Sequence, residues 1–274
     1  MLRTLPCCFH PTTILFVDDD AHLLHGMSFQ LLDHFLPKQF CSPVEALDFL
    51  KTFKNSSFSE ACLHPEMDFK GTLKTLFNPH RFETISIAVV DFAMPDMTGV
   101  EFLERINTRD CKKVMFTGEA WNIEGLNIFN FNSIDRICRK SETSEAMRAI
   151  FEDMELRYFQ EHTQALLSLF KHQGKPIPAC LLDPNLIAPV LKKFEDKKIV
   201  EFYLVNHEGL FLTLQPQGQL EWFLLQSELE FQKNPHTYTK ERIQTPTQNY
   251  FSAFFPYDPA GFPLEKILPF NQVV

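Results

Sequence analysis

The stretch ISIAVVDFAMPDMTG, residues 85–99, decides the fold of the first half of the chain. It opens with an apolar, largely β-branched run that reaches Val90 and ends abruptly at Asp91. A short continuous apolar run of this kind is typical of a strand that is buried on both faces of a parallel sheet. We therefore expect a buried strand over 85–90 with a carboxylate at its carboxyl end.

A second run of the same kind lies upstream. Residues 13–17 are apolar and β-branched, and three acids follow at once, Asp18, Asp19 and Asp20. Because open α/β sheets place their sites at the carboxyl ends of their strands, we expect these acids to lie near Asp91.

Working outward from the two runs, strands and helices alternate over the first 143 residues. Expected strands also lie at 40–41, 113–116 and 135–138, and expected helices at 23–32, 43–53 and 101–106. This order predicts an α/β domain, a doubly wound five-stranded parallel sheet with right-handed crossovers. Residues 55–84 do not fit this alternation of strands and helices and are interpreted as an insertion on the surface of this domain.

The second half has a different pattern. Apolar residues keep a mostly helical spacing from Ser144 to His172, which predicts a connector helix over 144–173 that extends the last helix of the first domain. Residues 174–274 are predicted to form a small α+β domain. In it we expect a helix over 183–196, an antiparallel meander with strands at 199–206, 210–214 and 220–225, and an irregular tail over 250–270.

The acids at the two strand ends point to a cation. Any one of them alone is more simply read as a helix cap, and Asp20 fits that interpretation best. Together, buried carboxylates repel one another and need a positive charge nearby. The expected fourth strand ends at Thr117 and the fifth near Lys140, so a hydroxyl and an ammonium group join the set.

These residues carry a resemblance: the first 150 or so positions resemble the receiver domains of response regulators. The matching segments are 17–20 (VDDD), 90–99 (VDFAMPDMTG), 115–120 (MFTGEA) and 139–140 (RK). The resemblance implies a flavodoxin-like fold and transfer of a phosphoryl group to Asp91.

The resemblance also implies a role for each site residue. Asp91 is the nucleophile, and Asp19, Asp91 and the backbone carbonyl of Ala93 hold Mg²⁺, with Asp18 acting through water. Lys140 pairs with a phosphoryl oxygen and the Thr117 hydroxyl binds another.

Three positions depart from the family pattern. Ser141 follows Lys140 where a proline is usual, and Ile137 stands where an aromatic switch residue is common. Thr98 replaces the usual Asp or Asn of the turn. None of them touches the nucleophile or the metal carboxylates, so we expect the chemistry to survive and its readout to be unconventional.

Composition narrows the classes of function. The net charge of −9 argues against sequence-independent binding to DNA. The seven cysteines show no CxxC spacing, Cys62, His64 and His80 form no recognised zinc pattern, and no apolar run is long enough for a membrane span. We expect a cytoplasmic, bacterial protein without a membrane anchor.

The sequence thus predicts a two-component response regulator that is phosphorylated by a sensor histidine kinase or a phosphotransfer protein. No catalytic motif appears after residue 150, and His162 is interpreted as a solvated surface histidine. The second domain is expected to bind a protein or a small ligand, and the helix over 144–172 to form a homodimer. Two alternatives stay open: an unrecognised enzyme gated by the receiver, and a pseudo-receiver scaffold that is never phosphorylated.

Overall fold

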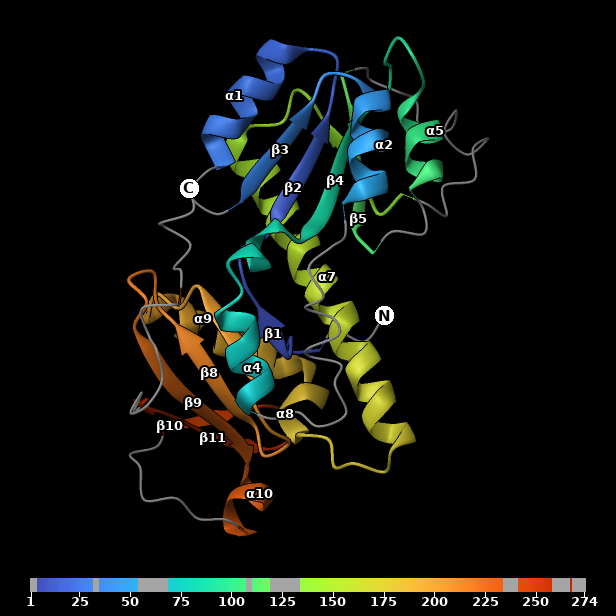
Figure 1. The fold of residues 1–274 in the computed structure, drawn as a ribbon. Coiled ribbons are helices and arrows are strands. Elements are labelled where there is room, and N and C mark those ends of the chain that lie inside the picture. The colour runs from blue at the N-terminus through green and yellow to red at the C-terminus, as the bar shows by residue number, and fades with distance from the viewer. Residues whose placement is uncertain are drawn as a thin grey trace. The chain divides into compact units, whose positions relative to one another are not determined.

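Two separate sheets organise the chain (Figure 1). The structure, a computed structural model, describes residues 4–31, 35–53, 69–106, 110–118, 134–233, 241–257 and 267. The parallel-sheet unit comprises Thr12–Ser56 and Phe82–Tyr158. The antiparallel-sheet unit comprises Met1–Pro11, Ser57–Arg81 and Phe159–Val273.

The parallel-sheet unit has five strands in the order β3-β2-β4-β5-β6, all parallel, which confirms the doubly wound fold. The strands are β2 (Thr13–Val17), β3 (Leu36–Phe40), β4 (Ile85–Asp91), β5 (Lys112–Thr117) and β6 (Arg136–Arg139). Its helices are α1 (Ala21–Leu31), α2 (Pro43–Thr52), α5 (Gly99–Arg105) and the first part of α7 (Ser144–His172). Strand β3 begins earlier than expected, because Pro37 is tolerated in a strand at the edge of the sheet.

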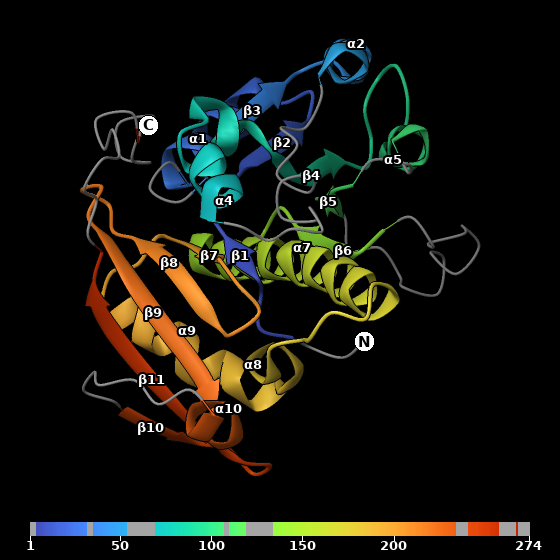
Figure 2. The same ribbon diagram turned by 60° about the horizontal axis from the view of Figure 1, so that its bottom comes forward.

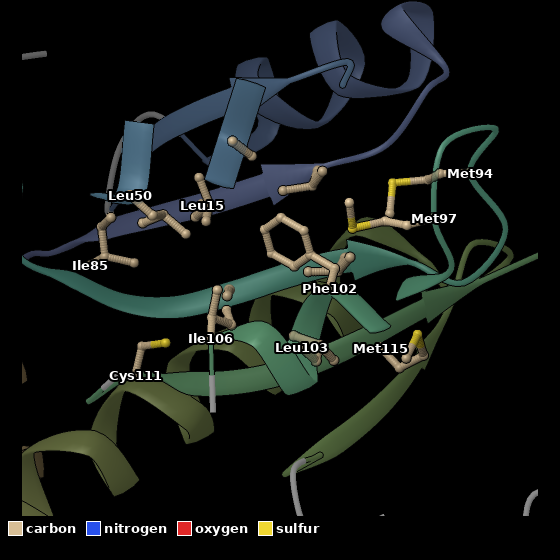
Figure 3. Packing of buried hydrophobic residues seen from close by; sticks show 14 residues of the cluster. Leu15, Leu50, Ile85, Met94, Met97, Phe102, Leu103, Ile106, Cys111 and Met115 are labelled. Carbon is tan, nitrogen blue, oxygen red and sulfur yellow. The ribbon is translucent and has the colours of Figure 1, made fainter. Parts of the chain in front are cut away.

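Two apolar cores cover the two faces of this sheet. Alternate residues of β2 separate them: Ile14 and Phe16 pack with α1 and α7, whereas Leu15 and Val17 pack with α2 and α5. Figure 3 shows the second core, with the Phe102 ring of α5 lying over the sheet. Packing on both faces of the sheet therefore fixes the positions of the strand ends.

The antiparallel-sheet unit has six strands in the order β1-β7-β8-β9-β11-β10 (Figure 2). They are β1 (Cys8–Phe9), β7 (Glu201–Leu204), β8 (Leu210–Leu214), β9 (Leu220–Ser227), β10 (Glu241–Gln244) and β11 (Asn249–Pro256). The helical segments are α4 (Phe69–Leu76), η1 (Pro79–Glu83), α8 (Ala179–Leu182), η3 (Pro184–Leu186), α9 (Ile187–Asp196) and α10 (Glu228–Lys233). The predicted meander is present as β7, β8 and β9.

The division of the chain differs from the expected boundaries of 1–143, 144–173 and 174–274. Residues 1–11 and most of the 55–84 segment group with the antiparallel sheet, because β1 pairs with β7 and Arg81 binds Glu201 of β7. These partners lie more than 100 residues apart in the sequence, and no pattern within a short stretch of sequence predicts such pairings.

The tail was predicted to be irregular, and this was wrong for residues 249–256. They form β11, which pairs with β9 on one side and β10 on the other. Large aromatic residues in this stretch reflect a strand packed within a sheet, a context that composition alone does not reveal.

Helix α7 runs unbroken over the predicted residues, and the first part of its apolar stripe is buried within the chain. Met147, Phe151 and Met154 belong to the core of the parallel-sheet unit, and Tyr158 is buried as well. Of the two later residues of the stripe, Ala165 is exposed and Leu169 is half-buried. Homodimerisation through this helix stays a prediction. His162 is buried, contrary to the expected solvated histidine.

Candidate functional site

An acidic cluster lies at the carboxyl edge of the parallel sheet. Val17 pairs with Val90, so β2 and β4 end level and Asp18 comes beside Asp91. Ligand oxygens of Asp18, Asp19 and Asp91 all lie within 4.8 Å of one another. The structure therefore brings the three predicted metal carboxylates together.

Lys140 supplies the positive charge. Its Nζ lies 2.7 Å from Oδ2 of Asp18 and 2.9 Å from Oδ1 of Asp91. Burial is the strongest influence on Asp18 and, with the charge of Asp91, raises its pKa in spite of Lys140. Burial acts to lower the pKa of Lys140, but its bonds to Asp18 and Asp91 and their charges together raise it. The Lys140 ammonium group thus lies between two carboxylates.

Asp20 has the capping role that its position suggested. Its Oδ1 accepts hydrogen bonds from the backbone N–H groups of His22 at 2.9 Å and Leu23 at 3.1 Å, in the first turn of α1. The backbone N–H of Asp20 in turn donates to Oδ1 of Asp18 at 2.9 Å, which helps to orient that carboxylate.

Thr117 and Lys140 lie at the ends of neighbouring strands. Thr117 is buried and pairs with Arg139 across the β5–β6 ladder, and its carbonyl accepts from the Lys140 N–H at 2.8 Å. The Lys140 ammonium lies 5.8 Å from the centre of the Phe116 ring. All four elements of the resemblance therefore meet at one sheet edge, whereas Ile137 is 39% exposed on β6.

The loop after Asp91 is held tightly. Ala93 bridges Thr98, and the Gly99 N–H donates to the Phe92 carbonyl at 2.9 Å. A Cβ on Gly99 would lie 2.2 Å from the carbonyl oxygen of Asp91, so only glycine fits here. Thr98 caps α5 in a reciprocal arrangement with Glu101, which explains how it replaces Asp or Asn in this turn.

The donor set fits a magnesium ion. Mg²⁺ prefers oxygen ligands and is bound by one or two carboxylates while it keeps several waters. Asp18 is buried, whereas Asp19 is exposed, so the cluster is open to solvent on one side. Among the residues that the structure describes, this is the one group of three or more potential metal ligands.

The comparisons with known proteins now bear on the site. No family model and no curated protein matches the chain. Among solved structures, the Legionella pneumophila response regulator LqsR matches 100% of this chain and 96% of its own, with 26% identity and a TM-score of 0.80. The parallel-sheet unit has the fold of a response-regulator receiver domain.

Other matches cover about half of the chain. A CheY-like receiver domain protein from Methanospirillum hungatei covers 55% of the chain at 21% identity and a TM-score of 0.40. A receiver domain protein from Clostridium thermocellum covers 53% at 18% identity and a TM-score of 0.38. The full-length match to LqsR extends over the antiparallel-sheet unit as well, whose family is not recognised.

Sequence reasoning missed a buried polar cluster in that second unit. Arg81 is 1% exposed and makes a bidentate ion pair with Glu201, with Nε and Nη2 each 2.9 Å from a carboxylate oxygen. The Tyr203 hydroxyl donates to the same carboxylate at 2.6 Å. A lone arginine in an irregular segment gives no sequence signal for such a partner.

Three further predictions concern the Cys/His group, Ser141 and membrane spans. His80 is exposed, and Cys62 and His64 lie outside the described residues. Ser141 follows Lys140 in a turn in which the Glu142 N–H donates to the Arg139 carbonyl at 3.1 Å. Within the described part of the chain, no helix combines the length and the apolar character needed to cross a membrane.

Proposed function

We propose that this protein is a two-component response regulator whose receiver accepts a phosphoryl group on Asp91 in a magnesium-dependent reaction. One observation carries the proposal: Asp18, Asp19 and Asp91 cluster at the carboxyl edge of the sheet, and Lys140 contacts two of them. This is the arrangement that phosphoryl transfer requires, because the chemistry depends on positioning and on charge neutralisation.

Each residue has a defined task in this reaction. An Asp91 oxygen forms a bond to phosphorus while the bond from phosphorus to the donor breaks, which gives an aspartyl phosphate. Lys140 is close enough to exchange its contact with Asp91 for a phosphoryl oxygen, and Thr117 offers a hydroxyl from the next strand.

Asp19, Asp91 and the Ala93 carbonyl would hold Mg²⁺, with Asp18 acting through water. The ion would supply positive charge to offset that of the phosphoryl oxygens during transfer. The Asp20 backbone N–H donates to the Asp18 carboxylate, which helps to keep the acidic loop in position.

The expected donor is a sensor histidine kinase or a phosphotransfer protein, since each carries the phosphoryl group on a histidine. The receiver residues, Thr12–Ser56 and Phe82–Tyr158, contain 20 Asp and Glu against 12 Lys and Arg, a net charge of −8. A donor with a basic docking surface is therefore favoured. The antiparallel-sheet unit serves as an output unit that binds a protein or small ligand and not DNA.

Beryllofluoride, a mimic of the acyl phosphate, tests the proposal. We expect it to bind the full chain only in the presence of Mg²⁺, and Asp91→Asn to abolish binding as measured by calorimetry. Asp96→Asn is the matched control, because Asp96 is exposed in the same loop and should leave binding unchanged.

Two results contradict the proposal. Unchanged binding in the Asp91→Asn protein removes Asp91 as the acceptor, and absence of binding in the unaltered protein favours the pseudo-receiver. Depletion of a substrate from a metabolite mixture, dependent on Mg²⁺ and beryllofluoride, favours an enzyme gated by the receiver.

A further inference from the structure

Strand β7 of the antiparallel-sheet unit receives two segments from distant parts of the chain. On one side β1 pairs with it, Cys8 opposite Tyr203 and Phe9 opposite Phe202. The Leu204 N–H also donates to the Cys7 carbonyl at 2.6 Å. The second segment is η1, whose Arg81 binds Glu201.

The Arg81 contact is strong and specific. The guanidinium matches both oxygens of the Glu201 carboxylate, and its Nη1 also donates to the carbonyls of Leu76 and Asn78 at 3.0 and 3.4 Å. Tyr203, the neighbour of Glu201 on the same face of β7, completes the cluster. Because both charges are almost fully buried, the cluster has one satisfactory arrangement and tolerates little displacement.

The β1 contact is reinforced from α7. The Thr163 hydroxyl accepts a hydrogen bond from the Cys7 N–H at 2.8 Å, and the Phe159 ring lies 5.2 Å from that of Phe9. His10 contacts the rings of both Phe159 and Tyr203. The residues just before β2 are therefore anchored by several independent contacts.

Both anchored segments lead directly into the strands that end at the acidic site. Phe9 is the last residue of β1 and Thr13 the first of β2, which leads to Asp18 and Asp19. Arg81 lies four residues before Ile85, the first residue of β4, which ends at Asp91. One strand, β7, thus binds the segments that come a few residues before the two strands that carry the three site carboxylates.

We propose that β7 is the element through which the second unit senses the state of Asp91. The change would reach β7 through β1 and Arg81, which come shortly before β2 and β4 in the sequence. This inference rests on the proposed function and names its route of regulation. It also gives a physical alternative to an aromatic switch, since Ile137 occupies that position and offers no ring.

Hydrogen exchange measured by mass spectrometry on the full chain tests this route. Mg²⁺ with beryllofluoride should change exchange in peptides covering residues 201–204 by roughly fivefold or more, the lower end of allosteric coupling. Tyr203→Phe keeps the ring but removes the 2.6 Å hydrogen bond to Glu201, so it should reduce this change without weakening beryllofluoride binding. Arg81→Lys, which loses the bidentate fork, should do the same.

Tyr250→Phe is the matched control. Tyr250 is a buried tyrosine of the same sheet whose hydroxyl bonds to Gln248 and Ala179 rather than to residues of β1 or η1. We expect it to respond like the unaltered protein, which separates coupling from a general loss of stability.

The outcomes distinguish the two proposals. Failure of beryllofluoride to bind overturns the proposed function and this inference with it. Binding without a change over 201–204, or a Tyr203→Phe protein that responds fully, overturns the route through β7 alone.

Discussion

At the scale of single residues, Lys140 balances the charge of the acidic edge. Its ammonium group contacts Asp18 and Asp91, whose side chains are almost fully buried. Without a cation these carboxylates repel each other in a poorly solvated place. Lys140 and Mg²⁺ therefore contribute to the same charge balance.

Lys140→Met should destabilise the metal-free receiver by about 1–3 kcal/mol, because it leaves two neighbouring carboxylates without their cation. Mg²⁺ should stabilise this variant more than the unaltered protein, and urea unfolding with and without the metal measures both effects. Lys112→Met is the control, since Lys112 pairs with Asp135, at the start of β6 rather than at the site. If Mg²⁺ stabilises Lys140→Met and the unaltered protein equally, Lys140 and Mg²⁺ do not balance the same carboxylate charges.

His10 gives the antiparallel-sheet unit a dependence on pH. Burial, followed by the charges of Arg81 and His162, lowers the pKa of His10 from 6.5 to about 3, against the opposing bond to the Pro11 carbonyl. Because folding depresses this pKa, the neutral ring stabilises the fold fully above pH 6.5. That contribution is lost as the pH falls from 6.5 toward 3.

His10→Gln should therefore lose less stability than the unaltered protein when the pH is lowered from 6.5 to 5. The expected difference is about 2 kcal/mol, since each pH unit corresponds to about 1.4 kcal/mol for one proton. Urea unfolding at the two pH values measures it. Curves of stability against pH that run parallel for His10→Gln and the unaltered protein would refute the assignment.

At the scale of elements, the start of α5 shapes the loop beside the phosphoacceptor. The Thr98 cap fixes where the helix begins, and Gly99 then passes directly against the Asp91 backbone. The helix start and the nucleophile are thus positioned by one close contact.

Gly99→Ala should destabilise the receiver by about 1–3 kcal/mol and weaken beryllofluoride binding, because the added methyl group collides with the Asp91 carbonyl. Thermal unfolding and calorimetry measure the two effects. Gly26→Ala in α1 is the control: nothing lies within 4 Å of its Cβ, so it should stabilise by about 0.5–1 kcal/mol. Normal binding in Gly99→Ala would show that the contact is not needed for the site.

At the scale of the whole molecule, segments of the two units alternate along the chain. The chain passes between the units after residues 11, 56, 81 and 158. The antiparallel sheet therefore depends on residues from three separate segments, which local folding of residues 174–274 alone does not supply.

The fragment 174–274 should consequently lack a cooperative urea transition, whereas the full chain has one. It lacks β1 and leaves the buried Glu201 carboxylate without Arg81, and loss of one partner of a buried pair costs about 3–5 kcal/mol. Circular dichroism during urea titration gives the comparison. A sharp transition in the fragment would show that residues 174–274 form an independent domain after all.

The site was predictable because its signals are local. Asp18, Asp91 and Thr117 each lie at the end of a short apolar strand, Lys140 follows the more polar strand β6, and parallel strands bring such ends to one edge. The boundaries of α7 and the meander followed from periodicity and from the glycines of its turns. Here local pattern and tertiary structure agree, as they do wherever burial of an apolar face decides the element.

The sequence by itself determined the receiver fold, its acidic edge and the long helix, because each depends on patterns within a few dozen residues. Only the tertiary structure decided that β1 and Arg81 bind strand β7 of the second sheet, that β11 lies inside that sheet, and that the first part of the α7 stripe is buried. The physical reason is the same in each case: a strand or a buried charge is satisfied by a partner far along the chain, and residue type does not name that partner.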